Sequence, residues 1–149
     1  MDYIRLTRQF SFETAHALLN YNGPCKNIHG HSYKLQVTIL GKPITDTTDP
    51  KYGMVMDFGD LKKMVNETIV APLDHALILR EDTDPELVAM LQQLNHKLVL
   101  TSYQPTCENM LIEFRKKLQI SLPKSVQLHS LRLWETENSF AEWFASDNV

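Results

Sequence analysis

The first forty residues alternate between apolar and polar side chains in two separate stretches. From 3 to 16 the apolar side chains fall on even positions, with Arg8 as the exception, and from 29 to 39 they fall on odd positions. This period of two predicts half-buried strands, because successive side chains of a strand point to opposite faces of the sheet. His16 shares the apolar parity of the first stretch, and His29 and His31 share that of the second. All three imidazoles are therefore expected to point inward.

The segment 41–53, after the second alternating stretch, is rich in Asp, Thr, Pro and Gly. This composition predicts a long hairpin connection, and a short strand is expected after it at about 54–56. The apolar spacing of 57–70 then becomes that of a helix, with Asp57 or Asp60 as its N-cap.

The second half of the chain continues with a short extended piece at 73–79. The Asp-Pro pair at the start of 84–96 predicts a second helix, because Asp is a favoured N-cap and Pro a favoured first helical residue. Thr106 is the expected N-cap of a third helix. Two final strands are predicted at about 126–135 and 139–145, the first with a β-bulge because its apolar parity changes.

Strands are gathered at the two ends of the chain rather than alternating with helices, which indicates an antiparallel sheet. The predicted fold class is α+β, with a four-stranded antiparallel sheet covered by helices on one face. A length of 149 residues suits one domain with a real core, so a single domain over 1–149 is expected.

With 43% hydrophobic and 22% charged residues, the chain is expected to fold as an ordinary globular protein. Its net charge of −3 argues against a general nucleic-acid or anionic-membrane surface, so any anionic ligand has to be met by local cations. No stretch is long and apolar enough for a membrane helix, and the N-terminal residues show no secretion-signal pattern. The two cysteines, Cys25 and Cys107, are expected to be free thiols in the cytoplasm.

Three of the six histidines are those on the apolar faces of the two N-terminal strands. His29 and His31 lie at i and i+2 of one strand and can reach one ion, and His16 supplies a third imidazole from the neighbouring strand. Three nitrogen ligands with an open fourth position are typical of catalytic zinc, although other divalent ions also suit them. The alternative is that each is a core histidine hydrogen-bonded to a backbone carbonyl.

Cys25 lies in a predicted loop, 20–28, just before His29. The residues alone leave open whether it is a fourth metal ligand, a base or nucleophile, or an inert thiol. A neighbouring cation favours the thiolate form of a cysteine. Asp74 and His75 offer a proton relay in which the carboxylate fixes the tautomer of the imidazole, although such a pair is more often part of a solvated turn.

Six segments occur in order along the chain and cover nearly all of it. They are FSFETAH (10–16), CKNIHGHSY (25–33), GMVMDFGDLK (53–62), LDH (73–75), PTCEN (105–109) and WET (134–136). Together they resemble the family of 6-pyruvoyl-tetrahydropterin synthases and 6-carboxy-tetrahydropterin synthases, which is far more specific than any one motif.

The resemblance implies a zinc ion held by His16, His29 and His31, with Cys25 as the catalytic base. The implied substrate is 7,8-dihydroneopterin triphosphate. Zinc would polarise the side-chain hydroxyls of this substrate, while Cys25 removes a proton from a side-chain carbon and triphosphate is eliminated. In the carboxy-forming branch the side chain is also cut, which releases acetaldehyde and leaves 6-carboxy-5,6,7,8-tetrahydropterin for the 7-deazaguanine route to queuosine.

The resemblance further implies that Asp74 and His75 relay protons for the base, and that Glu135 anchors the pterin, with Glu108 and Thr106 lining the same pocket. A pterin presents an exocyclic amine and a ring N–H side by side, and one carboxylate can accept both hydrogen bonds. Without the resemblance, Glu135 would be interpreted as an exposed strand-end carboxylate, and Glu108 as a favourable charge at a helix N-terminus.

Three residues separate Cys25 from His29, a spacing that the resemblance associates with carboxy-forming members rather than pyruvoyl-forming ones, which have a longer gap. This spacing favours the carboxy branch. The sequence departs from the family pattern at Cys107, where Ser or Ala is usual, and in an insert at about 81–100. A non-catalytic, zinc-stabilised pterin-binding protein is the alternative from another functional class.

Family members adopt the tunnelling fold, in which subunits join their sheets into a barrel and two trimeric rings stack as a hexamer. An open four-stranded sheet has edges that need cover, and ring closure between subunits would provide it. The resemblance therefore implies a homohexamer, a dimer of trimers. Part of the constellation of Cys25, His75 and Glu135 is then expected to meet only across an interface between subunits.

Overall fold

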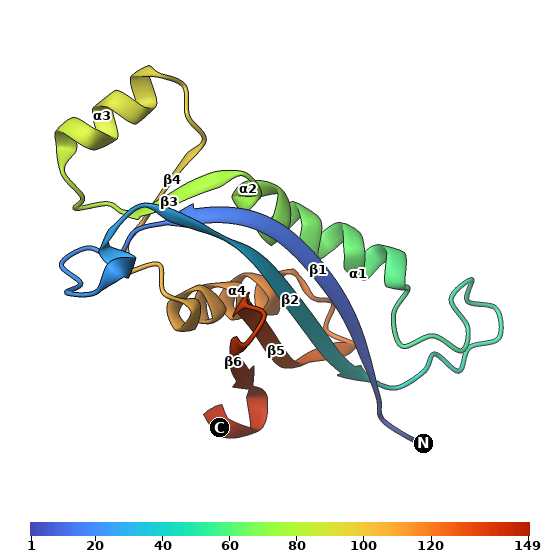
Figure 1. Ribbon diagram of the computed structural model, residues 1–149. Helices are drawn as coiled ribbons and strands as arrows, with labels where there is room; N and C mark the ends of the chain where they lie inside the picture. The colour runs from blue at the N-terminus through green and yellow to red at the C-terminus, as the bar shows by residue number, and fades with distance from the viewer.

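A curled sheet runs through the computed structural model, which describes all 149 residues (Figure 1). The strand order is β4-β3-β1-β2-β5-β6. The bounds are β1 Ile4–His16, β2 His29–Gly41, β3 Ala76–Arg80, β4 Leu98–Thr101, β5 Val126–Thr136 and β6 Ser139–Phe144. The α+β class is confirmed, but the sheet has six strands rather than the predicted four.

The two additional strands, β3 and β4, come from the extended piece after the first helix and from the insert. β3 pairs in parallel with the end of β1, and β4 pairs in parallel with β3. Both are short, and three of the five residues of β3 are buried without strict alternation. They lack the period of two that identifies a half-buried strand, which is why the extended piece predicted at 73–79 was not counted in the sheet and β4 was not predicted.

Helical segments follow the predicted order with small corrections. Their bounds are η1 Pro24–Lys26, α1 Phe58–Val65, η2 Asn66–Val70, α2 Ala71–Leu73, α3 Pro85–Gln93, α4 Cys107–Ser121 and η3 Ala145–Asn148. α1, the π-helical turn η2 and α2 follow one another directly and form the predicted first helix. Asp57 is its N-cap, accepting the Gly59 N–H at 2.6 Å, and Thr106 caps α4 by accepting the Asn109 N–H at 3.2 Å.

The strand predicted at 54–56 is wrong, because this segment forms a bend. The backbone here bonds across the connection to Ile44 rather than to a strand of the sheet: the Ile44 N–H donates to the Met54 carbonyl and the Gly53 N–H to the Ile44 carbonyl, both at 2.9 Å. The run of apolar side chains reflects instead the burial of Val55, which belongs to the core.

One hydrophobic core lies between the sheet and the helices. Inward side chains of the sheet, among them Phe12, Tyr33 and Leu35, pack with residues of α1 and α4 such as Leu61 and Phe114. α3 contributes no buried residue and stands away from the other helices (Figure 1). None of the helices combines the length and the apolar character that crossing a membrane requires.

The register of β1 and β2 decides which side chains meet at one end of the sheet. The strands are antiparallel, with His16 opposite His29 and Thr14 opposite His31. On the other side of β2 the pairing with β5 shifts by one residue at His129, which confirms the predicted bulge. The bulge lies far along β2 from the histidines, so their mutual register is undisturbed.

Candidate metal and substrate site

The three predicted histidines converge at the end of the β1 and β2 pair. Their ring centroids are 4.6 to 5.1 Å apart, and one nitrogen of each lies within 4.8 Å of the others. His16 is only 2% exposed, while His29 and His31 are partly buried. Strand geometry explains the cluster, since His29 and His31 share a face and His16 lies directly opposite His29. His16, His29 and His31 could hold a metal ion.

Backbone carbonyls orient two of these rings. The Nδ1 atom of His16 lies 2.7 Å from the Pro105 carbonyl oxygen, and the Nδ1 atom of His29 lies 2.7 Å from the Asn27 carbonyl oxygen. A carbonyl only accepts hydrogen bonds, so each Nδ1 carries the proton and each Nε2 presents a lone pair. The two Nε2 atoms are 3.1 Å apart. Facing lone pairs at this distance repel, and a cation between them would turn repulsion into ligation.

His31 completes the donor set. Its Nε2 atom is buried and has no hydrogen-bond partner. The nearest carboxylate oxygen, Oε1 of Glu135, is 3.5 Å away, too far for a good hydrogen bond. Burial lowers the pKa of both His31 and His16, which favours the neutral imidazole that metals bind. An orphaned buried nitrogen beside two oriented lone pairs fits a bound divalent ion.

A cleft of about 340 Å³ adjoins this cluster, and most of the predicted site residues line it. His16 comes from the end of β1, Cys25 from the loop between β1 and β2, and Thr106 and Glu108 from the start of α4. Glu135, near the end of β5, faces the same space. These residues lie far apart in sequence and are brought together by the β1–β2–β5 pairing and by the helix packed on it.

Cys107 also lines the cleft, although it was predicted only as a departure from the family pattern. Its thiol donates to the Leu133 carbonyl oxygen at 3.3 Å. Burial raises the pKa of this thiol to about 12, with the Glu135 carboxylate adding to the effect. Cys107 therefore stays protonated at neutral pH, unlike the thiolate that a base would need.

Asp74 and His75 form the predicted pair, but at a different cavity. Oδ2 of Asp74 lies 3.0 Å from Nδ1 of His75. A separate cavity of about 470 Å³ is lined by His75, together with His31 and Lys97, and Cys25 does not reach it. The His75 side chain is 76% exposed. Within one chain, the proposed base and its proposed relay are therefore not in contact.

The turn that carries this pair is fixed to β1. Oδ1 of Asp74 accepts the Glu13 N–H at 2.8 Å, and the His75 N–H donates to the Glu13 carbonyl at 2.6 Å. The Glu13 N–H, helped by His75, lowers the pKa of Asp74 below its usual range. His75 has φ of 61°, a left-handed conformation that is uncommon for non-glycine residues, and the two bonds to Glu13 hold the turn in place.

Three residues that position the site were not predicted. Lys97 donates to the carbonyl oxygens of Ala71 and Asp74 at 2.7 Å each, and so braces the turn before His75. The Pro105 carbonyl accepts a hydrogen bond from the His16 ring, and the Gln104 side chain forms hydrogen bonds with the backbone of Leu19. The sequence carried one indirect signal, the capping residue Thr106, which marks the segment before it as a fixed turn.

Solved structures share this fold along nearly the whole chain. The 6-pyruvoyl tetrahydropterin synthase of Caenorhabditis elegans is 26% identical and superposes with a TM-score of 0.67, covering 97% of each chain. An uncharacterized protein from Wolinella succinogenes is 19% identical with a TM-score of 0.74, covering 97% of this chain and 99% of its own. The predicted subunit fold is thereby confirmed.

Sequence comparison gives the family. The profile of the family described as 6-pyruvoyl tetrahydropterin synthase matches residues 5–145, and the chain belongs to this family. The 6-carboxy-5,6,7,8-tetrahydropterin synthase of Haemophilus influenzae is 37% identical over 141 residues, which cover 93% of this chain and 97% of that protein. The human 6-pyruvoyl tetrahydrobiopterin synthase is 33% identical over 147 residues, covering 91% and 87% respectively.

Proposed function

We propose that this protein is a zinc-dependent lyase acting on 7,8-dihydroneopterin triphosphate. With one water, the substrate yields 6-carboxy-5,6,7,8-tetrahydropterin, acetaldehyde and triphosphate, a step of 7-deazaguanine and queuosine biosynthesis. The observation that carries the proposal is that His16, Cys25 and Glu135 line one cleft of about 340 Å³. The names of relatives from Haemophilus influenzae and Rickettsia typhi support the carboxy-forming branch, as does the short gap between Cys25 and His29.

The predicted site residues of the cleft have separate roles in this reaction. The Glu135 carboxylate accepts two parallel N–H groups of the pterin and so sets the orientation of the ring, while Thr106 and Glu108 line the wall beside it. Cys25 removes a proton from the substrate's side-chain carbon. When held by the three imidazoles, zinc supplies Lewis-acid polarisation of the side-chain hydroxyls.

The proton taken by Cys25 has to leave, and the pair of His75 and Asp74 can carry it. The Asp74 carboxylate keeps the proton of His75 on Nδ1, which leaves Nε2 free to accept another. Since Cys25 and His75 of one chain line different cavities, we propose that the relay of one chain serves the base of its neighbour.

An assembly of several chains is part of the proposal. β4 and β6 are the outer strands of the sheet, and their free edges present unpaired backbone groups. Joining these edges between chains would close a barrel, and two stacked trimeric rings would give a homohexamer. A cytoplasmic location is also proposed, because both cysteines are free thiols, as is usual in reducing compartments.

Acetaldehyde release tests the proposal. The zinc-loaded protein is incubated with 7,8-dihydroneopterin triphosphate, and acetaldehyde, triphosphate and pterin products are measured for wild type and Cys25→Ala. Equal amounts of acetaldehyde and triphosphate from wild type, and neither from a Cys25→Ala protein that keeps its zinc, are expected. Triphosphate without acetaldehyde would instead indicate the pyruvoyl-forming reaction, which the family description and the human relative favour.

A third outcome would reject catalysis altogether. If wild type binds pterin but releases neither product, and Cys25→Ala binds equally well, the protein is a zinc-stabilised pterin-binding protein. The zinc content of both proteins, measured by elemental analysis, has to be the same for this comparison to hold.

A further inference from the structure

The loop 17–28, which carries Cys25, joins the metal-site strands β1 and β2. Its own hydrogen bonds fold it back on itself, with the Leu18 N–H donating to the Cys25 carbonyl at 2.9 Å. The short helix η1 is followed by Asn27, whose carbonyl oxygen lies 2.7 Å from Nδ1 of His29. The position of Cys25 relative to the imidazoles therefore depends on how this loop is held against the rest of the protein.

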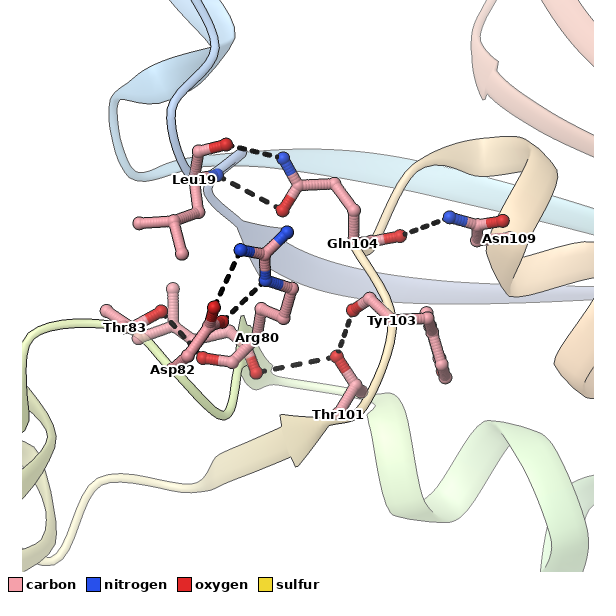
Figure 2. Close-up of polar contacts among 9 residues, drawn as sticks. Leu19, Arg80, Asp82, Thr83, Thr101, Tyr103, Gln104 and Asn109 are labelled. Carbon is pink, nitrogen blue, oxygen red and sulfur yellow. Dashed lines mark hydrogen bonds and ion pairs between the residues drawn. The ribbon is translucent and has the colours of Figure 1, made fainter.

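Gln104 makes that connection. Its amide Nε2 donates to the Leu19 carbonyl at 2.8 Å, and its Oε1 accepts the Leu19 N–H at 3.2 Å, as Figure 2 shows. The amide thus pairs with both backbone groups of one loop residue, in the way that a neighbouring strand would. Apart from the contact between Asn27 and His29, these are the hydrogen bonds that join the loop to other parts of the chain.

The backbone of Gln104 is itself fixed. Its carbonyl accepts the Thr106 N–H at 2.8 Å and the Asn109 side-chain amide at 3.0 Å, the second of which is visible in Figure 2. Thr106 caps α4, so the segment is anchored to the start of the longest helix. The next residue, Pro105, is buried and holds the His16 ring through its carbonyl. Two adjacent residues therefore fix the Cys25 loop and one candidate metal ligand.

From this geometry we propose that Gln104 is a positioning residue: it aligns the thiol of Cys25 with the three-imidazole site. The inference rests on the proposed function for its catalytic consequence, but the alignment itself does not depend on the substrate. Gln104 acts through the loop, since it lies outside the residues that line the cleft. A displacement of a reacting group by about 1 Å can reduce a rate by about 10²-fold.

The chemistry of the contact requires an amide. Leu19 presents one donor and one acceptor, and only a side chain with both can pair with them. A carboxylate only accepts hydrogen bonds. Gln104→Glu therefore keeps the bond from the Leu19 N–H, but it loses the bond to the Leu19 carbonyl and places two oxygens in repulsive contact. Gln104→Leu removes both bonds with little change of volume. Gln93→Glu, an exposed position at the end of α3, makes the same charge change elsewhere.

The experiment measures two properties of these three variants and of wild type. The first is the rate at which iodoacetamide alkylates Cys25, followed on the Cys25 peptide by mass spectrometry in the zinc-loaded protein without substrate. The second is kcat and KM for 7,8-dihydroneopterin triphosphate. Zinc content and thermal unfolding are measured on the same samples.

We expect Gln104→Leu and Gln104→Glu to change the Cys25 alkylation rate by about threefold or more, and to lower kcat by about tenfold or more with a smaller change in KM. Zinc content should remain at the wild-type value, and Gln93→Glu should behave as wild type. Unchanged alkylation rates in both Gln104 variants would overturn the proposal. Loss of zinc would also overturn it, because Gln104 would then support the whole end of the sheet rather than the loop. Wild type without turnover would reject the proposed function, while the alkylation comparison would still test Gln104.

Discussion

The Nε2 atoms of His16 and His29 lie 3.1 Å apart, and the Nδ1 atom of each ring is 2.7 Å from a backbone carbonyl oxygen. The carbonyls dictate which nitrogen carries the proton, so the two rings face each other with lone pairs. The buried Nε2 of His31, which lacks a hydrogen-bond partner, points to the same conclusion. The sheet therefore brings together three imidazole nitrogens that could hold a metal ion.

The first prediction concerns metal content. His31→Ala should weaken zinc binding by more than about 100-fold, because even the loss of an outer-shell partner of a ligand costs 10- to 100-fold. Equilibrium dialysis followed by elemental analysis measures the affinity. His96→Ala, an exposed histidine outside the cluster, is the control and should bind like wild type. Wild-type affinity in His31→Ala would remove this residue from the ligand set.

The second prediction concerns the pterin anchor. Glu135→Gln replaces one acceptor oxygen by an NH₂ donor, which faces a pterin N–H and cannot bond to it. kcat/KM for the triphosphate substrate should fall by about 10²-fold or more, since two charge-assisted hydrogen bonds are affected. Glu137→Gln makes the same change two residues away on an exposed side chain and should have little effect. Similar losses in both variants would argue against a specific anchor at Glu135.

The third prediction follows from the hydrogen bonds of Asp74. The Glu13 N–H, and after it His75, lower the pKa of Asp74 in the folded state. The stabilisation by the carboxylate is therefore complete above its unfolded pKa and is lost as the pH falls through the lower folded pKa. Asp74→Asn should reduce the free energy of unfolding at about pH 7, and this deficit should shrink at about pH 3 and below. Urea unfolding at the two pH values measures it, with Asp2→Asn as an exposed control. A deficit that does not change with pH would contradict this interpretation.

The fourth prediction concerns the reactivity of the Cys107 thiol. Burial raises the pKa of Cys107 to about 12, so at pH 8 its thiolate fraction is on the order of 10⁻⁴. Iodoacetamide should modify the Cys107 peptide about 10³-fold more slowly in the folded protein than in urea. The rate in the folded protein should rise about tenfold per pH unit between pH 8 and pH 10, as the thiolate fraction grows. Equal rates in the two states would show that burial does not protect this thiol.

Much of the fold could be predicted because its main elements are long and half-buried. β1 and β2 each have thirteen residues with one buried face, and a period of two reveals such strands. The run Met54 to Met56 has the composition of a strand, but it pairs with no strand of the sheet, so composition alone misled the prediction. β3 and β4 depend on parallel pairing between segments that are distant in sequence, which no local pattern records.

The candidate site, like the fold, could be predicted only in part. Parity placed His16, His29 and His31 on one face, because strand geometry is regular over this distance. The contacts of Gln104 with Leu19 and of Pro105 with His16 join residues 85 and 89 positions apart. One partner in each contact is a backbone group, which every residue carries, so the sequence does not show which residues meet; the Thr106 N-cap indicates only that a turn precedes α4. The three-dimensional structure was needed to find the positioning residues.

Acetaldehyde release by mixed oligomers tests most directly whether neighbouring chains build one lyase site. Cys25→Ala and His75→Ala are purified separately and also co-expressed in equal amounts, each protein loaded with zinc. If Cys25 of one chain works with His75 of another, each variant alone is inactive, and about a quarter of the sites in mixed oligomers keep both residues. The expected result is about a quarter of the wild-type rate from the mixture. A mixture as inactive as the separate variants would contradict a site shared between chains, and full activity of either variant alone would remove that residue from catalysis.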